Sequence, residues 1–257
     1  PAAVKMTCEP HMDAPRFEIV TGAQVKAARP DEGTIARGIA RSPWTGETVD
    51  GEYIKAEAQA GRMGQMLYAV AVKKRGGFDF RTPTEDDLQA ARRAEQELQR
   101  KKPIWIAKDI IPTEPFPGGN DPRPLMYGMD NWSAFFSPRQ LLAMGVFIET
   151  LYELEKEIRE SASEQHADAV CLYLGIALDK CPNYNSRMSV WHALRTSMAN
   201  TFNRHDFSFA YSHGEFDAAG NLIPWAVEQI VDSYKGLADL VAPAQQSLVQ
   251  ISNKRPV

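Results

Sequence analysis

The chain has 257 residues, 44% of them hydrophobic and 24% charged, and a formal net charge of −4. This length allows a real hydrophobic core and fits one large domain or two small ones. No apolar run approaches the roughly 18 residues that a membrane-spanning helix needs, so the sequence predicts no membrane protein. Residues 1–110 carry a net charge of +2 and the remainder −6, so any contact with nucleic acid has to be local.

Short strands and turns are predicted for the first 80 residues. Alternating polarity predicts strands at 16–21 and 34–40, and a β-branched and aromatic run predicts another at 66–72, closed by the basic turn KKRGG. Residues 52–60 are rich in Ala, Glu and Lys, which favours a short helix ending at Gly61. Together these elements predict a small β-ribbon region.

A capped helix and an irregular segment follow. Thr84 and Asp87 form a capping pair for a helix that we expect to run to about Lys101 and to end at Pro103. Residues 104–111 read as an edge strand, and the proline-rich stretch 112–124 is too irregular for regular structure. That stretch is the best internal boundary, which predicts domains 1–111 and 112–257.

The second half is predicted to be mainly helical. Ser137 and Pro138 open an amphipathic helix that reaches about Glu160. Residues 167–180 are apolar nearly all round, which predicts a central buried helix stopped by Pro182, and a last helix is expected from Pro224 to about Leu240. The predicted fold class is α+β, with a small N-terminal β-ribbon region followed by a mainly α-helical domain.

The most chemically loaded stretch is Asn183–Glu215, called here the Arg-aromatic segment. Between Asn183 and His205 it holds three arginines and no acidic residue. Arginine grips phosphate or a guanine edge, asparagine pairs with an adenine edge, and aromatic rings stack on an extruded base. The candidate nucleic-acid-binding residues are Arg187, Trp191, His192, Arg195, Asn200, Phe202, Arg204 and His205. Composition alone favours an ordinary core instead, with the arginines solvated or in buried ion pairs, because clusters of aromatic residues and arginine are common in helical cores.

Several blocks of the sequence resemble one family. Two of these blocks are YNSRMSVWH and NTFNRHDFSFAYSHGEF, and three more lie upstream: GTIARGIARSPWTGETVDGEYIKAEAQAGRMGQMLYAVAV, PTEDDLQAARRAE and YGMDNWSAFFSPRQLLAM. In their order along the chain they are similar to the central region of large bacterial adenine-specific DNA methylases that carry a zinc-ribbon insertion. The resemblance covers most of the chain from about Phe17 to Ile230. It implies DNA as a partner, and it carries the candidate residues over as a block without assigning their individual roles.

The resemblance also implies a division of labour. In the family, the S-adenosylmethionine turn lies upstream of this region and an Asp-Pro-Pro-Tyr loop lies downstream, and this chain contains neither. We therefore expect no catalytic or cofactor-binding residue here, S-adenosylmethionine as a cofactor of the parent protein only, and flanking methyltransferase domains as partners. The first residue is not Met, which indicates processing or a segment of a longer protein.

No metal is expected. The family's ribbon has a cysteine pair near the position of Ser42–Gly46, whereas this chain has no Cys-x-x-Cys anywhere, so the ribbon is predicted to be a metal-free remnant with Trp44 filling the space. Two weaker groupings stay open: Cys8 with His11, and His192 with His205 and Glu215. The widely spaced Cys8, Cys171 and Cys181 favour reduced thiols and, with no secretion signal at the N-terminus, a cytoplasmic protein.

A function from another class stays open beside DNA recognition. The Arg-aromatic segment could instead pack against the catalytic halves of the parent, which would make the chain a structural scaffold. An independent enzyme is disfavoured, because the sequence has no GxSxG, Walker or HExxH motif.

Overall fold

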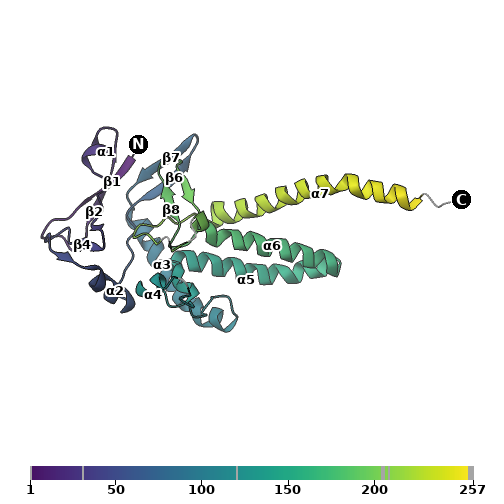
Figure 1. Cartoon of the computed structure of the whole chain (residues 1–257), viewed down its shortest axis with the longest axis horizontal. Coiled ribbons are helices and arrows are strands. Elements are labelled where there is room, and N and C mark those ends of the chain that lie inside the picture. The colour runs from purple at the N-terminus through teal and green to yellow at the C-terminus, as the bar shows by residue number, and fades with distance from the viewer. Residues whose placement is uncertain (1, 31, 120, 204–205, 208, 254–257) are drawn as a thin grey trace. The chain divides into compact units, whose positions relative to one another are not determined.

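The computed structural model describes residues 2–30, 32–119, 121–203, 206–207 and 209–253. Small sheets and helices make up these residues, which confirms the α+β class (Figure 1). The chain divides into two compact units, which we describe separately. The first consists of Pro1–Arg139 with the short returns His192–Ser197 and His205–Phe207, and the second contains the rest. Residues 111 and 112, where the sequence suggested a boundary, both belong to the first unit.

An antiparallel hairpin opens the first unit. The predicted strand 16–21 is confirmed as β2 (Arg16–Thr21), and it pairs over its full length with β1 (Ala2–Thr7), which was not predicted. A short helix, α1 (Gln24–Ala27), follows.

A three-stranded sheet of β3 (Ile35–Ala36), β4 (Ile39–Arg41) and β5 (Thr48–Val49) comes next. The single strand expected at 34–40 is wrong, because Gly38 at φ +78° turns the chain between β3 and β4. In the β4–β5 turn, Ser42 Oγ accepts hydrogen bonds from the N–H groups of Trp44 and Thr45 at 3.3 and 3.2 Å. The Trp44 indole donates to the Met12 carbonyl at 3.0 Å. Hydroxyl and indole hydrogen bonds thus close the β4–β5 turn.

A helix and a second hairpin complete the ribbon region. The helix α2 (Gly51–Gln59) is capped by Asp50 and is followed by Gly61 at φ +71°, as predicted. The strand expected at 66–72 lies instead at β6 (Val70–Lys74), and it pairs with β7 (Gly77–Arg81).

The helix α3 (Glu85–Ala107) begins with the predicted capping box of Thr84 and Asp87, but it does not end where expected. It continues through Pro103, so the predicted edge strand at 104–111 is wrong. Trp105 on the last turn is completely buried. We attribute the continuation to this burial, because a buried indole removes a large apolar surface from water and offsets the hydrogen bond that proline cannot make.

The proline-rich stretch leads into a four-residue helix, α4 (Arg123–Met126), and a 3-10 turn, η1 (Trp132–Phe135). The rings of Phe116, Trp132 and Phe135 pack together, with centroids 5.1 to 5.6 Å apart. Gly128 is required here, since a Cβ atom would come within 2.4 Å of the Ala58 carbonyl oxygen. This close approach fixes the stretch against α2.

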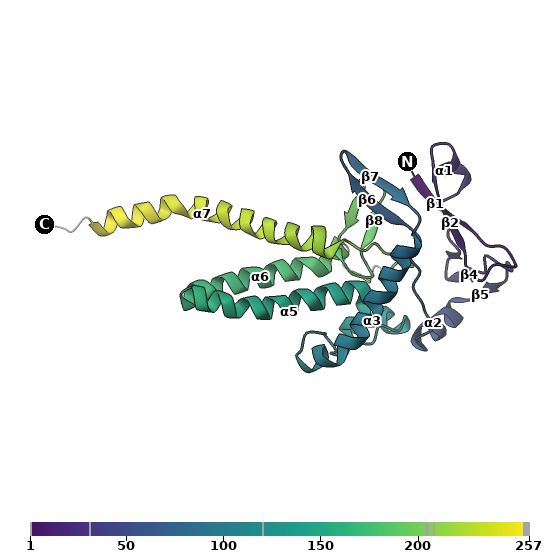
Figure 2. The same ribbon diagram turned by 180° about the vertical axis from the view of Figure 1, so that it is seen from behind.

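Three long helices form the second unit: α5 (Pro138–Ser161), α6 (Glu164–Tyr184) and α7 (Ile223–Asn253), the last preceded by a π-helical turn, η3 (Ala218–Leu222). Figures 1 and 2 show α5 and α6 side by side as a hairpin and α7 beginning along α6. Their shared core includes Met144, Phe147, Ala177, Cys181, Leu222 and Ala226.

Two predictions about α6 are wrong. The helix is not buried all round, because Leu172 is 64% and Ile176 42% exposed, and it continues through Pro182 to Tyr184. Within the described residues no helix is long and apolar enough to cross a membrane.

Candidate nucleic-acid interface

The Arg-aromatic segment forms a small hairpin. Its strands β8 (Val190–His192) and β9 (Ser197–Ala199) pair in a two-stranded sheet and are followed by a 3-10 turn, η2 (Thr201–Asn203). Only residues 193–196 connect the strands, so the pair is antiparallel, since a parallel crossover needs a dozen residues or more.

Buried hydroxyl groups hold the base of this segment. Ser186, Ser189 and Thr201, which we call the hydroxyl knot, are between 0% and 8% exposed. The Oγ atom of Ser186 lies 2.7 Å from Thr201 Oγ1, and Ser189 Oγ accepts from the Ser186 N–H at 2.9 Å. Thr201 Oγ1 also donates to the Pro182 carbonyl at 3.3 Å. Because each hydroxyl has a partner, burying them carries little penalty and fixes one backbone path.

Two asparagines extend this anchoring in the second unit. The Oδ1 atom of the buried Asn185 accepts the Phe216 N–H at 3.0 Å, and Asn183 Oδ1 accepts the Phe202 N–H at 3.1 Å. The Gly214 N–H donates to the Ser189 carbonyl at 2.7 Å. The beginning and end of the segment are therefore tied to each other.

The hairpin tip, residues 193–196, has the opposite character. Leu194 is 95% exposed, and Arg195 is exposed beside it. The Arg195 N–H closes the turn by donating to the His192 carbonyl at 3.1 Å and to His192 Nδ1 at 3.2 Å. Thr196 follows at φ +47°, which is unusual for a β-branched residue. The turn thus holds a leucine and an arginine out toward solvent.

The Arg195 guanidinium makes no hydrogen bond or ion pair with any residue that the structure describes. Several other arginines of the described chain pair with carboxylates; Arg123, for example, pairs with Asp121 and Asp206. These carboxylates hold the pKa of Arg123 above its usual value, and Arg123 in turn holds that of Asp121 below its usual range. Of the predicted arginines that the structure describes, Arg195 is the one whose charge is available to an anion.

Arg187 lies in a different environment although it was predicted beside Arg195. Its side chain is half-buried, and its guanidinium stacks over the Phe209 ring at 5.4 Å. Burial lowers the pKa of this guanidinium from its usual value. This arrangement is typical of an arginine that supports the fold, so Arg187 is poorly placed to grip phosphate in this structure.

The other predicted residues are divided. Trp191, His192 and Asn200 are half-buried, whereas Phe202 is 68% exposed in η2. Arg204 and His205 lie outside the described residues. The structure therefore brings His192 and Arg195 together at one turn and gives Phe202 a separate exposed position. The exposed Leu194 side chain and the hydroxyl knot were not predicted. The sequence feature that could have indicated the exposure of Leu194 is its place in the four residues 193–196, between two short strand-like runs.

The predicted metal and cofactor features can be compared with the part of the chain that is described. No group of three or more His, Cys, Asp or Glu side chains could hold a metal ion there. Glu215 Oε1 lies 3.6 Å from His213 Nε2, and the suggested grouping of Glu215 with His192 and His205 includes His205, which lies outside the described residues. Gly118 and Gly119 lead into the four-residue α4, so they do not fit the strand, turn and long helix on which a nucleotide-type cofactor rests.

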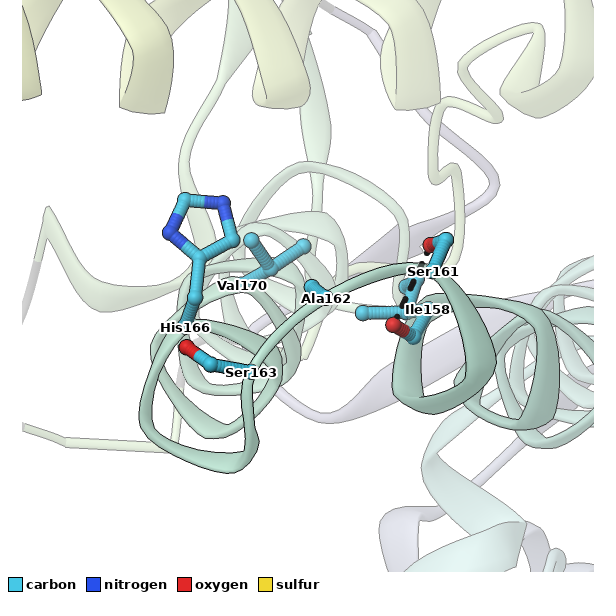
Figure 3. A pocket seen from close by; sticks show the side chains of 6 residues that line it. All are labelled: Ile158, Ser161, Ala162, Ser163, His166 and Val170. Atoms are coloured by element: carbon cyan, nitrogen blue, oxygen red, sulfur yellow. Dashed lines mark hydrogen bonds between the residues drawn. The ribbon is translucent and has the colours of Figure 1, made fainter.

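A hollow of about 540 Å³ opens at the α5–α6 turn (Figure 3). It is lined by Ile158, Ser161, Ala162, Ser163, His166 and Val170. The Ser161 hydroxyl donates back to the Ile158 carbonyl at 3.2 Å. Ser163 and His166 are the other polar residues of the lining, and no Asp, Glu, Lys, Arg or Cys joins them. We therefore do not assign the hollow as an active site.

Comparisons of the chain with protein-family models, curated proteins and solved structures find no match.

Proposed function

We propose that this chain is the non-catalytic central part of a cytoplasmic, S-adenosylmethionine-dependent DNA adenine methyltransferase, and that it helps to position DNA. The resemblance of its ordered sequence blocks supports the identity. The observation that carries the DNA-binding role is the β8–β9 tip, where Arg195 projects from a closed turn without an acidic partner in the described chain. Methyl transfer itself belongs to the flanking domains, which supply the cofactor turn and the target-amine loop.

The chemistry of the tip fits a phosphate backbone or a groove. An exposed guanidinium gains from phosphate by releasing condensed counterions, and arginine also enters narrow minor grooves. Because the whole chain is acidic, this contact is local and weak when the chain acts alone. It would orient DNA that other domains bind more tightly.

Fluorescence anisotropy with a labelled duplex, measured over a range of salt concentrations, tests this proposal. Arg195→Ala should weaken binding about threefold or more at low salt and reduce the slope of log K against log salt by about 0.9. Arg93→Ala is the matched control, because Arg93 is also exposed and carries the same charge on α3. Equal effects of the two substitutions, or none from Arg195→Ala, would reject the tip as a DNA contact. Turnover of S-adenosylmethionine by this chain alone would reject the central-part assignment.

One observation favours the scaffold function as a second candidate. Leu194 and Phe202 are 95% and 68% exposed, which suits docking against the catalytic halves of the parent. In that case Leu194→Asp should abolish association with the separately produced flanking domains and Arg195→Ala should not. Under the DNA proposal, Arg195→Ala should weaken DNA binding more than Leu194→Asp does.

A further inference from the structure

The helix α7 changes character along its length. Leu222, just before it, and Ala226, in its second turn, are completely buried in the core of the second unit. From Val231 to Ala242 every residue is exposed. Figures 1 and 2 both show α7 continuing past the end of the α5–α6 hairpin. The large apolar residues left uncovered are Val231, Tyr234, Leu237, Leu240 and Val241, at 44% to 75% exposure.

Three of them, Tyr234, Leu237 and Val241, belong to a seven-residue repeat. Counting from Val227, each first and fourth position of four successive heptads is apolar: Val227, Ile230, Tyr234, Leu237, Val241, Ala244, Leu248 and Ile251. A repeat of this kind sustained over three or four heptads is typical of helices that pair as a coiled coil. We call these eight positions the α7 stripe.

Among the stripe positions from Val227 to Val241, only the first ones have a partner inside the described chain. Val227 and Ile230 pack against the core of the second unit. Tyr234 still reaches α6, where its ring lies 5.5 Å from that of Tyr173. Leu237 and Val241 are 57% and 48% exposed, so α6 no longer covers the stripe there. Exposing a continuous apolar stripe to water is costly, which indicates that something else covers it.

The charge pattern around the α7 stripe bears on which partner covers it. The positions that flank the seam in a coiled coil hold Val231, Ser233, Ala238 and Leu240, none of which is charged. The charged residues Glu228, Asp232, Lys235 and Asp239 lie on the opposite side of the helical repeat. Flanking charges normally decide which helices pair, so their absence leaves no repulsion between identical stripes. Gly236 and Pro243, which weaken a helix, also fall outside the seam.

We propose that a second copy of this chain covers the α7 stripe, and that the two helices pair from about Tyr234 onward. The same surface on each copy then forms both sides of the interface, as in most two-fold dimers. The pairing buries the leucines and valines that the α5–α6 hairpin leaves exposed. It does not depend on whether the β8–β9 tip binds DNA.

Sedimentation velocity of the full chain, from micromolar to millimolar concentration, tests this proposal. The unchanged chain should sediment as a dimer. Leu237→Asp should raise the dimer dissociation constant at least about a hundredfold, because it places a charge in each copy of the seam. Gln229→Asp, on the exposed side of the same helix, is the matched control and should remain dimeric.

Leu237 is already exposed within a single copy, so its substitution should leave the helical circular dichroism signal and the unfolding midpoint of the monomer intact. Val241→Asp provides a second variant with the same expected loss. A monomeric unchanged chain throughout the concentration range would overturn the proposal, whether a different protein covers the stripe or nothing does. A dimer that survives both seam substitutions would overturn it as well, because the association would then lie elsewhere.

Discussion

The hydroxyl knot and the β8–β9 tip come from the same stretch of sequence and are built on opposite principles. In the knot, Ser189 is completely buried and all its hydrogen-bonding groups meet other protein groups. At the tip, Leu194 is almost completely exposed, and the guanidinium of Arg195 meets no described protein group. Residues of the first kind hold the backbone in one conformation, and those of the second kind are available to a partner.

The two arginines of the segment make the difference plain. Arg187 is half-buried and stacked on Phe209, whereas Arg195, eight positions later, is exposed. Both fit a nucleic-acid-binding pattern in sequence. Only their surroundings separate an arginine that supports the fold from one that can meet a ligand.

The largest effect on stability is expected within the knot. Ser189→Ala removes the acceptor of the Ser186 N–H and a partner of Thr201, and an unsatisfied buried group costs about 1–3 kcal/mol. The urea unfolding midpoint should fall accordingly. Ser197→Ala, which removes an exposed hydroxyl in the same hairpin, should stay within about 0.5 kcal/mol of the unchanged chain. Equal midpoints for the two variants would contradict the structural role of the knot.

A smaller effect should separate the two arginines. Arg187→Ala loses the packing of the side chain and its contact with Phe209, and should cost about 1–2 kcal/mol. Arg195→Ala should change stability by less than about 0.5 kcal/mol. Both variants are compared by urea unfolding, and the DNA measurements described above are repeated on each. If Arg187→Ala proves neutral for folding and weakens DNA binding more than Arg195→Ala does, our assignment of the two arginines is reversed.

Local signals predicted much of this fold. The capping box of Thr84 and Asp87, the Ser137–Pro138 helix start and the alternation of β2 each depend on residues within a few positions of one another. Such signals are read directly from sequence, and the structure contains all three elements.

The remaining features depend on contacts that are distant in sequence. Nothing near Pro103 indicates that α3 continues to bury Trp105, and nothing in the apolar run of α6 indicates that Leu172 faces solvent. For the candidate site the sequence pointed to the segment Asn183–Glu215 and to its arginines. It could not separate Arg187 from Arg195, because residue type does not reveal burial, and it missed Leu194 because leucine is usually assigned to the core.

Strain at the tip gives a prediction of opposite sign. Thr196 adopts φ +47°, where a β-branched residue is disfavoured and glycine is not. Thr196→Gly should therefore stabilise the chain, by up to about 1 kcal/mol, although it loses the bond from Thr196 Oγ1 to the Arg195 carbonyl. Ser197→Gly, in the adjacent strand, should destabilise it. Thermal unfolding of both variants decides whether the tip is held in a strained conformation.

The smallest effect is a dependence of stability on pH, which is expected for the charged residues around Phe207 in the first unit and not for the uncharged hydroxyl knot. There, Asp121 accepts the Phe207 N–H at 3.1 Å and pairs with Arg123, which holds the pKa of the Asp121 carboxyl below its usual range. A carboxyl with a lowered folded-state pKa contributes stability above its unfolded value, near pH 4, and loses it as pH falls through the folded value. The stability difference between the unchanged chain and Asp121→Asn should therefore be full at pH 7 and should shrink progressively below about pH 4. The loss of stability in Ser189→Ala involves no titrating group, so it should not change with pH in this way. If the loss of stability in Asp121→Asn stayed constant with pH, the ion pair with Arg123 would contribute nothing to folding.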